Sequence, residues 1–198
     1  MSRISKVPVE QWDPALRQMM SADQATPLEQ GLIRMMAHAP EITKGWLGFA
    51  FAMIQHGRLP RRLIELVRLR IAFHNQCRSC MAIRYQSAVD AGVTEDLVCS
   101  LERPSEAPDL TASEKAALAY ADRSATDHLS IDDAMFDKLR LHFDEPQIVE
   151  LGMFIANCIG FGRLAAAWSM VEDLPEAFQD KPGERLAPWQ APTVVVRG

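Results

Sequence analysis

Apolar residues recur at helical spacing along most of this 198-residue chain, and this pattern restricts its fold more than any other feature. Residues 40–56 illustrate the spacing, with apolar side chains at Ile42, Trp46, Phe49 and Met53. A repeat of three to four residues is typical of an amphipathic helix. Val, Ile and Thr form no alternating run except near the end, in "PTVVVRG". We therefore predict an all-α protein.

Capping residues, prolines and glycines divide the helical pattern into segments. The expected helices cover residues 9–20, 27–38, 40–56, 60–75, 78–91 and 145–170, with further helices that begin at "TEDL" (94–97), "TASE" (111–114) and "SIDD" (130–133). The glycines of "GFG", residues 160–162, indicate an irregularity in the last helix. The helices together predict one domain over residues 1–174, with its core at 40–168.

After Leu174 the character of the sequence changes, and we predict an extended tail over residues 175–198. The tail is punctuated by Pro175, Pro182, Pro188 and Pro192. Trp189 and "TVVV" make the tail more apolar than a solvated linker. Two alternatives therefore stay open, docking on a neighbouring subunit and disorder.

Charge and hydropathy restrict the partners of the protein. The net charge of −5 and a pI near 5.5 argue against a nucleic-acid partner. The run "WLGFAFAMI" is too short to cross a bilayer, and the start "MSRISKVPVEQW" has no apolar stretch like that of a signal peptide. We therefore expect a cytoplasmic protein without a membrane partner. In that compartment a close cysteine pair is usually catalytic or metal-binding.

Two thiols three residues apart, Cys77 and Cys80, mark the candidate site. They begin the helix expected over residues 78–91, where the helix dipole lowers the pKa of a thiol and favours the nucleophilic thiolate. A second thiol at this spacing resolves a sulfenic acid as a disulfide. The alternative is a pair of buried, inert cysteines.

The expected helices on either side of Asn75 place further groups near the pair. An antiparallel hairpin lays Glu65 opposite Arg84. Cys77, Cys80 and Arg84, spaced i, i+3, i+7, would share one helix face. Arg84 then favours the thiolate, while Glu65 orients Arg84 or accepts a proton. The alternative is a plain ion pair between packed helices.

His74 precedes the pair and is the best candidate among the five histidines. Together with Cys77 and Cys80 it offers three metal ligands, but no second cysteine pair follows, and zinc sites normally close with four ligands. Cys99 and Cys158 are isolated. We predict that the protein needs no metal and no cofactor.

The order of these residues is similar to that of a known family. Glu65, eleven further residues and "CRSC" at 77–80 resemble the alkylhydroperoxidase D-like, carboxymuconolactone decarboxylase-like family. Its pattern is a Glu, a Cys-x-x-Cys twelve residues later, and a His four residues after the second Cys. "RRLIELVRLRIAF" and "SAVDAGVTEDLV" are also similar, and the resemblance covers about residues 40–168.

The resemblance implies an orthogonal bundle of helices, self-association into trimers or hexamers, and thiol peroxidase or disulfide reductase activity. By position it makes Cys77 and Cys80 the redox pair and Glu65 the relay carboxylate. Arg84 stands where the family has its His, and Arg does not shuttle protons at neutral pH. Either Glu65, His74 or water then moves the proton, or the peroxidase activity is weak.

Three functions are compatible with these observations. The first is a thiol-dependent hydroperoxide reductase, with a small peroxide as substrate and a dithiol or thioredoxin-like reductant. The second is a decarboxylase-like lyase in which Arg84 holds a substrate carboxylate. The third is a non-enzymatic redox-sensing module. In each case the apolar residues in 40–56, in 145–170 and in the tail favour a homo-oligomer.

Overall fold

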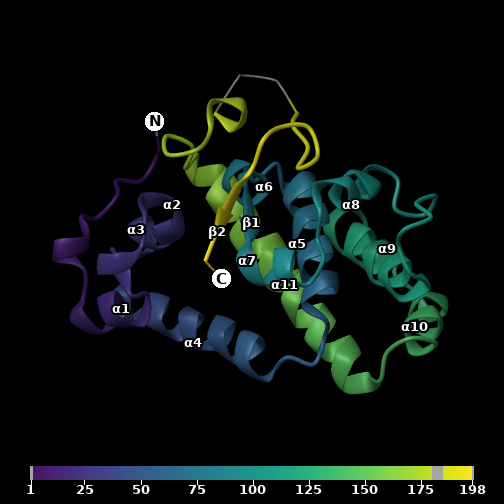
Figure 1. Ribbon diagram of the computed structural model, residues 1–198. Coiled ribbons are helices and arrows are strands. Elements are labelled where there is room, and N and C mark those ends of the chain that lie inside the picture. The colour runs from purple at the N-terminus through teal and green to yellow at the C-terminus, as the bar shows by residue number, and fades with distance from the viewer. Residues whose placement is uncertain (1, 180–184, 198) are drawn as a thin grey trace.

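The computed structural model describes residues 2–179 and 185–197, and it confirms the all-α prediction (Figure 1). The described residues form eleven α-helices: α1 Pro14–Met19, α2 Pro27–Gln30, α3 Ile33–Met36, α4 Pro40–His56, α5 Arg61–Asn75, α6 Arg78–Ala82, α7 Gln86–Asp90, α8 Glu95–Cys99, α9 Ala112–Thr126, α10 Asp133–Arg140 and α11 Glu145–Trp168. Two short strands, β1 Ile83–Tyr85 and β2 Val194–Val196, form a parallel pair. Short 3-10 helices at 9–11, 22–24, 100–102, 128–130 and 176–178 connect them.

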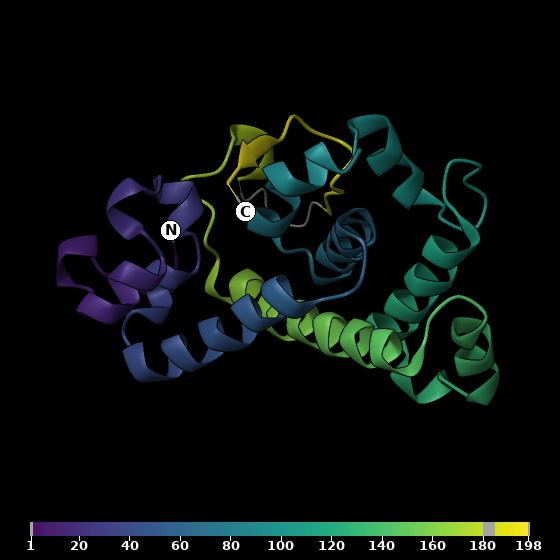
Figure 2. The same ribbon diagram turned by 60° about the horizontal axis from the view of Figure 1, so that its bottom comes forward.

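Helix α5 is the centre of the core. It packs against α9 and α11, and Figure 2 shows it surrounded by these helices and the C-terminal segment. Leu66, Val67, Leu69 and Ile71 of α5 are completely buried. Full burial of such a side chain contributes about 1.5–3 kcal/mol. The helix expected over residues 60–75 is thus confirmed as a core helix.

The expected caps fix where the helices begin. Thr111 and Glu114 form the capping box of α9, which "TASE" predicts. Thr94 accepts a hydrogen bond from the first turn of α8. Glu114 also accepts a hydrogen bond from Arg62 of α5 at 2.6 Å. The start of α9 is therefore tied directly to the central helix.

The two N-terminal helices expected from the sequence are each divided. Asp13 caps α1, so the segment expected over 9–20 contains a 3-10 turn and then a separate helix. Gly31 adopts a positive φ of 49° and ends α2. Such backbone angles suit glycine and interrupt a helix, which separates α2 from α3.

The helix expected over residues 78–91 is wrong. The chain leaves α6 after Ala82, forms β1, and resumes as α7. Strand β2 of the tail supplies the backbone partners of β1, with Ile83 opposite Val194 and Tyr85 opposite Val196. Residues 185–197 dock on their own chain, and additional docking on a neighbouring subunit stays a prediction. The domain boundary at residue 174 stays a prediction.

Helix α11 continues through "GFG" without the expected irregularity. A Cβ at Gly162 would collide with the amide of Asn75, which donates to the carbonyl of Cys158 at 3.0 Å. The glycine therefore serves the close approach of α5 to α11. By length and composition α11 is the one described helix that could cross a membrane, a test that core helices of soluble proteins also pass.

Candidate active site

The cysteine pair lies at the start of α6, as the sequence predicts. Cys77 is the N-cap residue, and its sulfur accepts a hydrogen bond from the backbone N–H of Cys80 at 3.4 Å. The two Cα atoms are 5.2 Å apart, and the sulfurs are joined in a disulfide. Cys77 is completely buried, whereas Cys80 is half-buried. Of the two sulfur-bearing residues, only Cys80 is therefore partly open to solvent.

Two buried arginines hold the backbone that follows the pair. Arg68 donates to the carbonyls of Cys80 and Ile83, at 2.7 and 2.9 Å. Arg84 donates to the carbonyls of Met81 and Ile83, both at 3.0 Å. The last carbonyls of a helix have no partner within it. Here two guanidinium groups satisfy them, so the end of α6 is fixed by permanent cations.

Glu65 lies behind this turn and is bound to Arg68. Its carboxylate is almost completely buried, and Arg68 binds both oxygens at 2.7 Å. Burial lowers the pKa of Arg68, but the Glu65 carboxylate outweighs it and the net shift is upward. Arg68 therefore stays charged, and a single guanidinium connects Glu65 with the backbone of Cys80.

The expected contact between Glu65 and Arg84 is wrong. Because α6 ends at Ala82, Arg84 does not continue the helix face of the cysteines. It is 1% exposed and pairs with Glu95 through two hydrogen bonds of 2.9 and 3.0 Å. Burial lowers the pKa of Arg84, and Glu95 opposes this shift. Arg84 instead reaches the tail, where it donates to the carbonyl of Pro188 at 2.8 Å.

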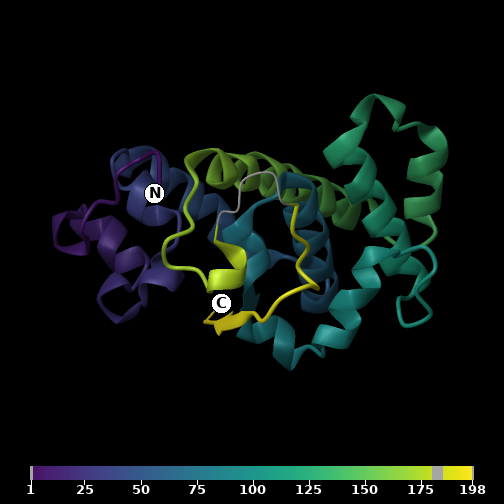
Figure 3. The same ribbon diagram turned by 90° about the horizontal axis from the view of Figure 1, so that it is seen from above.

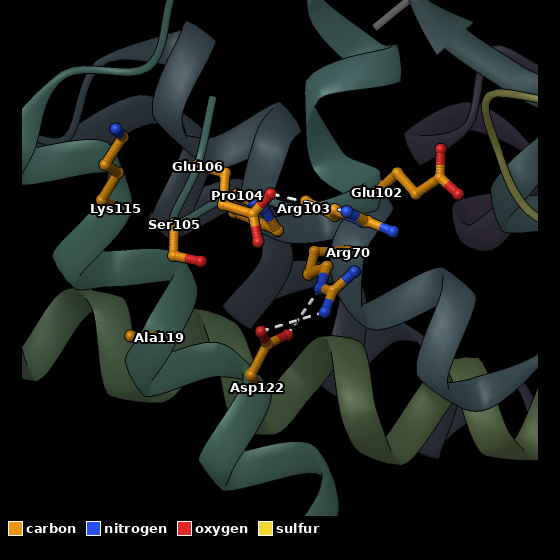
Figure 4. Close-up of a pocket in the computed structure, with 9 residues that line it drawn as sticks. All are labelled: Arg70, Glu102, Arg103, Pro104, Ser105, Glu106, Lys115, Ala119 and Asp122. Atoms are coloured by element: carbon orange, nitrogen blue, oxygen red, sulfur yellow. Dashed lines mark hydrogen bonds and ion pairs between the residues drawn. The ribbon is translucent and has the colours of Figure 1, made fainter. Parts of the chain in front are cut away.

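His74 belongs to a separate cluster between α5 and α9. Its Nε2 lies 2.7 Å from a carboxylate oxygen of Asp122, which Arg70 also binds at 2.6 Å. A cleft of about 450 Å³ opens beside Arg70 and Asp122, and Figure 4 shows their paired side chains at its edge. No cysteine lines this cleft. The geometry therefore separates His74 from the contacts that hold the redox pair.

Metal-ligating side chains do not gather in the described residues. No group of three or more His, Cys, Asp or Glu residues is placed there to hold an ion.

Three residues that contribute to the site were not predicted from the sequence. Arg68 could have been found, because a position three residues after Glu65 lies on the same helix face. Glu95 was assigned only to a capping sequence. Pro188 contributes a carbonyl from 104 residues away in the chain. No local pattern predicts such a contact.

Comparison with known proteins identifies where the similarity lies. Residues 40–123 match the model of the carboxymuconolactone decarboxylase family. Uncharacterized proteins of two Mycobacterium tuberculosis strains are 39% identical over 106 residues, which are 52% of this chain and 37% of each relative. YnjA of Escherichia coli, also uncharacterized, is 27% identical over 111 residues, or 56% of this chain and 59% of that protein. The match thus spans just over a third of the mycobacterial proteins.

Two solved structures share the fold. The alkylhydroperoxidase AhpD core of an uncharacterized peroxidase-related protein from Ralstonia eutropha has a TM-score of 0.71 and 19% identity. That match covers 89% of this chain and 94% of the other. A protein of unknown function from Agrobacterium tumefaciens has a TM-score of 0.58 and 24% identity, over 66% of this chain and 90% of its own. At these identities the likeness describes the fold alone.

Proposed function

Because residues 40–123 belong to the carboxymuconolactone decarboxylase family, within an alkylhydroperoxidase D-like fold, we propose that this protein is a thiol-dependent hydroperoxide reductase. The observation that carries the proposal is the disulfide between Cys77 and Cys80 at the start of α6. Cys80 is the half-buried member of the pair, and we assign to it the reaction with a small peroxide. The reductant is a dithiol or thioredoxin-like protein, and the expected location is the cytoplasm.

The reaction begins with the reduced pair. The Cys80 thiolate attacks one peroxide oxygen, the O–O bond breaks, and the alcohol leaves after it takes up a proton. The resulting sulfenic acid on Cys80 is attacked by Cys77, which displaces water and forms the disulfide. A dithiol then supplies two electrons and two protons and is itself oxidised to a disulfide. We assign the attack to Cys80 because Cys77 is completely buried.

Arg68 has the role that the sequence analysis predicted for Arg84. Its guanidinium binds the Cys80 carbonyl, and a nearby cation favours the thiolate. Glu65, held by the same guanidinium, is the proton relay together with water. His74 is bound to Asp122 in the other cluster and has no place in this step. We therefore assign no proton transfer to His74 or Arg84.

Single-turnover trapping tests these roles. The reduced protein is mixed with one equivalent of cumene hydroperoxide, and the sulfenic acid is trapped with dimedone and located by mass spectrometry. Cys77→Ser should accumulate the adduct on residue 80, whereas Cys80→Ser should form none. Cys80→Ser should lose peroxide turnover with dithiothreitol by at least about 100-fold, because the attacking thiolate is removed. Cys77→Ser should keep the peroxide-consuming step but form no intramolecular disulfide, because dithiothreitol then reduces the sulfenic acid directly.

Cys99→Ser is the matched control, since Cys99 is an exposed free thiol. It should keep full turnover. Equal turnover in all three variants would overturn the peroxidase proposal. A disulfide that forms with peroxide but supports only one turnover, with every reductant tried, would favour the redox-sensing module.

The lyase alternative loses its carboxylate-binding residue. A guanidinium has five N–H donors. In Arg84 all five are used, by the two oxygens of Glu95 and by three backbone carbonyls. No donor remains for a substrate carboxylate.

A further inference from the structure

Residues 185–197, here called the C-terminal strap, run across the part of the molecule that holds the cysteine pair. Figure 3 shows this segment crossing the region of α5 and α6. Its strand β2 pairs in parallel with β1, directly after α6. Arg197, near its end, pairs with Glu29 of α2 at 2.9 Å. The strap is therefore attached along its length to the domain beneath it.

The strap binds the residue immediately before the cysteines. Gln76 has a left-handed backbone, φ 51°, at the turn between α5 and α6. Its side-chain amide donates to the carbonyl of Leu186 and accepts from the N–H of the same residue, both at 3.0 Å. Trp189 packs on Phe73 with ring centroids 5.1 Å apart. The entry to the redox turn is thus fastened to the strap.

The strap also binds the segment that follows the cysteines. Arg84 donates to the carbonyl of Pro188, and its partner Glu95 accepts a hydrogen bond from Thr193 at 3.3 Å. Both Arg84 and Pro188 are buried. Without the strap, one N–H of the buried Arg84 guanidinium would lose its acceptor, which is costly, so Arg84 favours the closed strap. Arg84 thus connects the strap to the segment that follows the cysteines, and we call this contact the latch.

Apolar side chains of the strap also pack on the domain. Leu186 and Ala191 of the strap belong to the same apolar cluster as Cys80. The cluster is centred on buried residues that include Met81 and Phe178. A dithiol must approach a disulfide sulfur directly, through a mixed disulfide. The strap therefore packs on the same apolar cluster as the half-buried cysteine that such a dithiol would approach.

We propose that the C-terminal strap covers the Cys77–Cys80 pair, is latched by Arg84, and opens to admit the reductant. The inference rests on the proposed function only in naming a reductant. Strap opening is a local unfolding event that leaves the helical core folded. Arg84, at the family's His position, is then a positioning residue that acts through the strap.

The test measures reduction of the disulfide, which requires no peroxidase activity. The oxidised protein is mixed with dithiothreitol or with reduced thioredoxin, and acid-quenched samples are analysed for the two-dalton gain. Arg84→Gln and a chain that ends at residue 184 should be reduced at least about tenfold faster than the wild type. The acceleration should be larger with thioredoxin, because a protein needs more open space than a small dithiol.

Two further variants keep the test decisive. Arg123→Gln is the matched control, because Arg123 is exposed and pairs with Asp127 away from the strap. It should be reduced at the wild-type rate. Trp189→Ala removes packing of the strap on Phe73 and on the core of the domain. It provides the test if circular dichroism shows that Arg84→Gln does not fold.

If every folded strap variant is reduced within twofold of the wild-type rate by both reductants, the proposal that the strap covers the cysteine pair is wrong. Such a result says nothing about peroxide turnover. Conversely, faster reduction of the strap variants would support the proposal that the strap covers the cysteine pair, even if the protein consumes no peroxide. The peroxidase proposal and the strap proposal can therefore be rejected independently of each other.

Discussion

At the residue scale, the buried pair of Glu65 and Arg68 is the feature that most constrains the site. Removing one partner of a buried ion pair leaves an uncompensated charge and costs about 3–5 kcal/mol. We expect Arg68→Met to lower the free energy of unfolding by about this amount, measured by urea denaturation. The double variant Glu65→Gln/Arg68→Met should recover part of the loss. If the double variant is less stable than Arg68→Met, the pair is not coupled as described.

The two free thiols, Cys99 and Cys158, have different surroundings. Burial raises the pKa of Cys158 to about 12, against the opposing effect of Arg68, whereas Cys99 is exposed. At pH 8 the Cys158 thiolate is therefore scarce, although the side chain is only half-buried. We expect iodoacetamide to label the native oxidised protein once, at Cys99, and the unfolded oxidised protein twice. Labelling of Cys158 at a similar rate in the native protein would contradict its burial.

The sequence predicted the identity of the central site residues better than their contacts. Glu65 and the cysteine pair follow from spacing alone. The partner of Glu65 was assigned across an expected hairpin, but Arg68 on the same helix is closer. Ion pairs depend on side-chain direction, and periodicity predicts only which face a residue occupies.

At the scale of elements, Asp122 joins α5 to α9 and makes stability dependent on pH. Burial raises the pKa of Asp122, but hydrogen bonds from His74 and Arg70 outweigh it, and the net shift is downward. Such a carboxylate stabilises the fold above its unfolded pKa, near 3.8, and loses this contribution as the pH falls through its lower folded pKa.

We therefore expect Asp122→Asn to lower the free energy of unfolding at pH 7 by about 2 kcal/mol. The difference from the wild type should shrink at pH 2, because this pH lies below the unfolded pKa of 3.8 and the stabilisation from the lowered folded pKa is then partly lost. Urea denaturation at both pH values measures the two differences. Asp127→Asn, at an exposed ion pair, should have little effect at either pH. A difference that grows towards low pH would contradict the ion-pair account.

Long, periodic helices were predictable, and the short connecting elements were not. α4, α5 and α11 carry uninterrupted apolar repeats and begin close to where the sequence places them. The segment 78–91 has good helical periodicity as well. There, two guanidinium groups take the carbonyls at the end of α6, and β2 pairs with β1. Both interactions come from distant residues or from side-chain direction, so tertiary contacts override the local pattern.

At the scale of the whole molecule, the described surface leaves a large apolar area uncovered. Val149 and Met153, one turn apart on α11, are 57% and 47% exposed. On α4, Ile42 and Ile54 are 76% and 49% exposed. Isolated exposed apolar residues are normal, but a stripe along a long core helix is typical of an interface. The homo-oligomer stays a prediction, and these exposed side chains are its candidate interface.

The last prediction is that α11 contributes to self-association. Sedimentation velocity at micromolar concentration should show a species larger than a monomer, and the family resemblance implies a trimer or hexamer. Met153→Glu places a charge in the stripe and should shift the protein towards the monomer, because burial of an unpaired charge opposes association. Leu129→Glu is the matched control, since Leu129 is 86% exposed on a separate 3-10 turn. A wild-type protein that sediments as a monomer at all these concentrations, or equal association in the two variants, would rule out this interface.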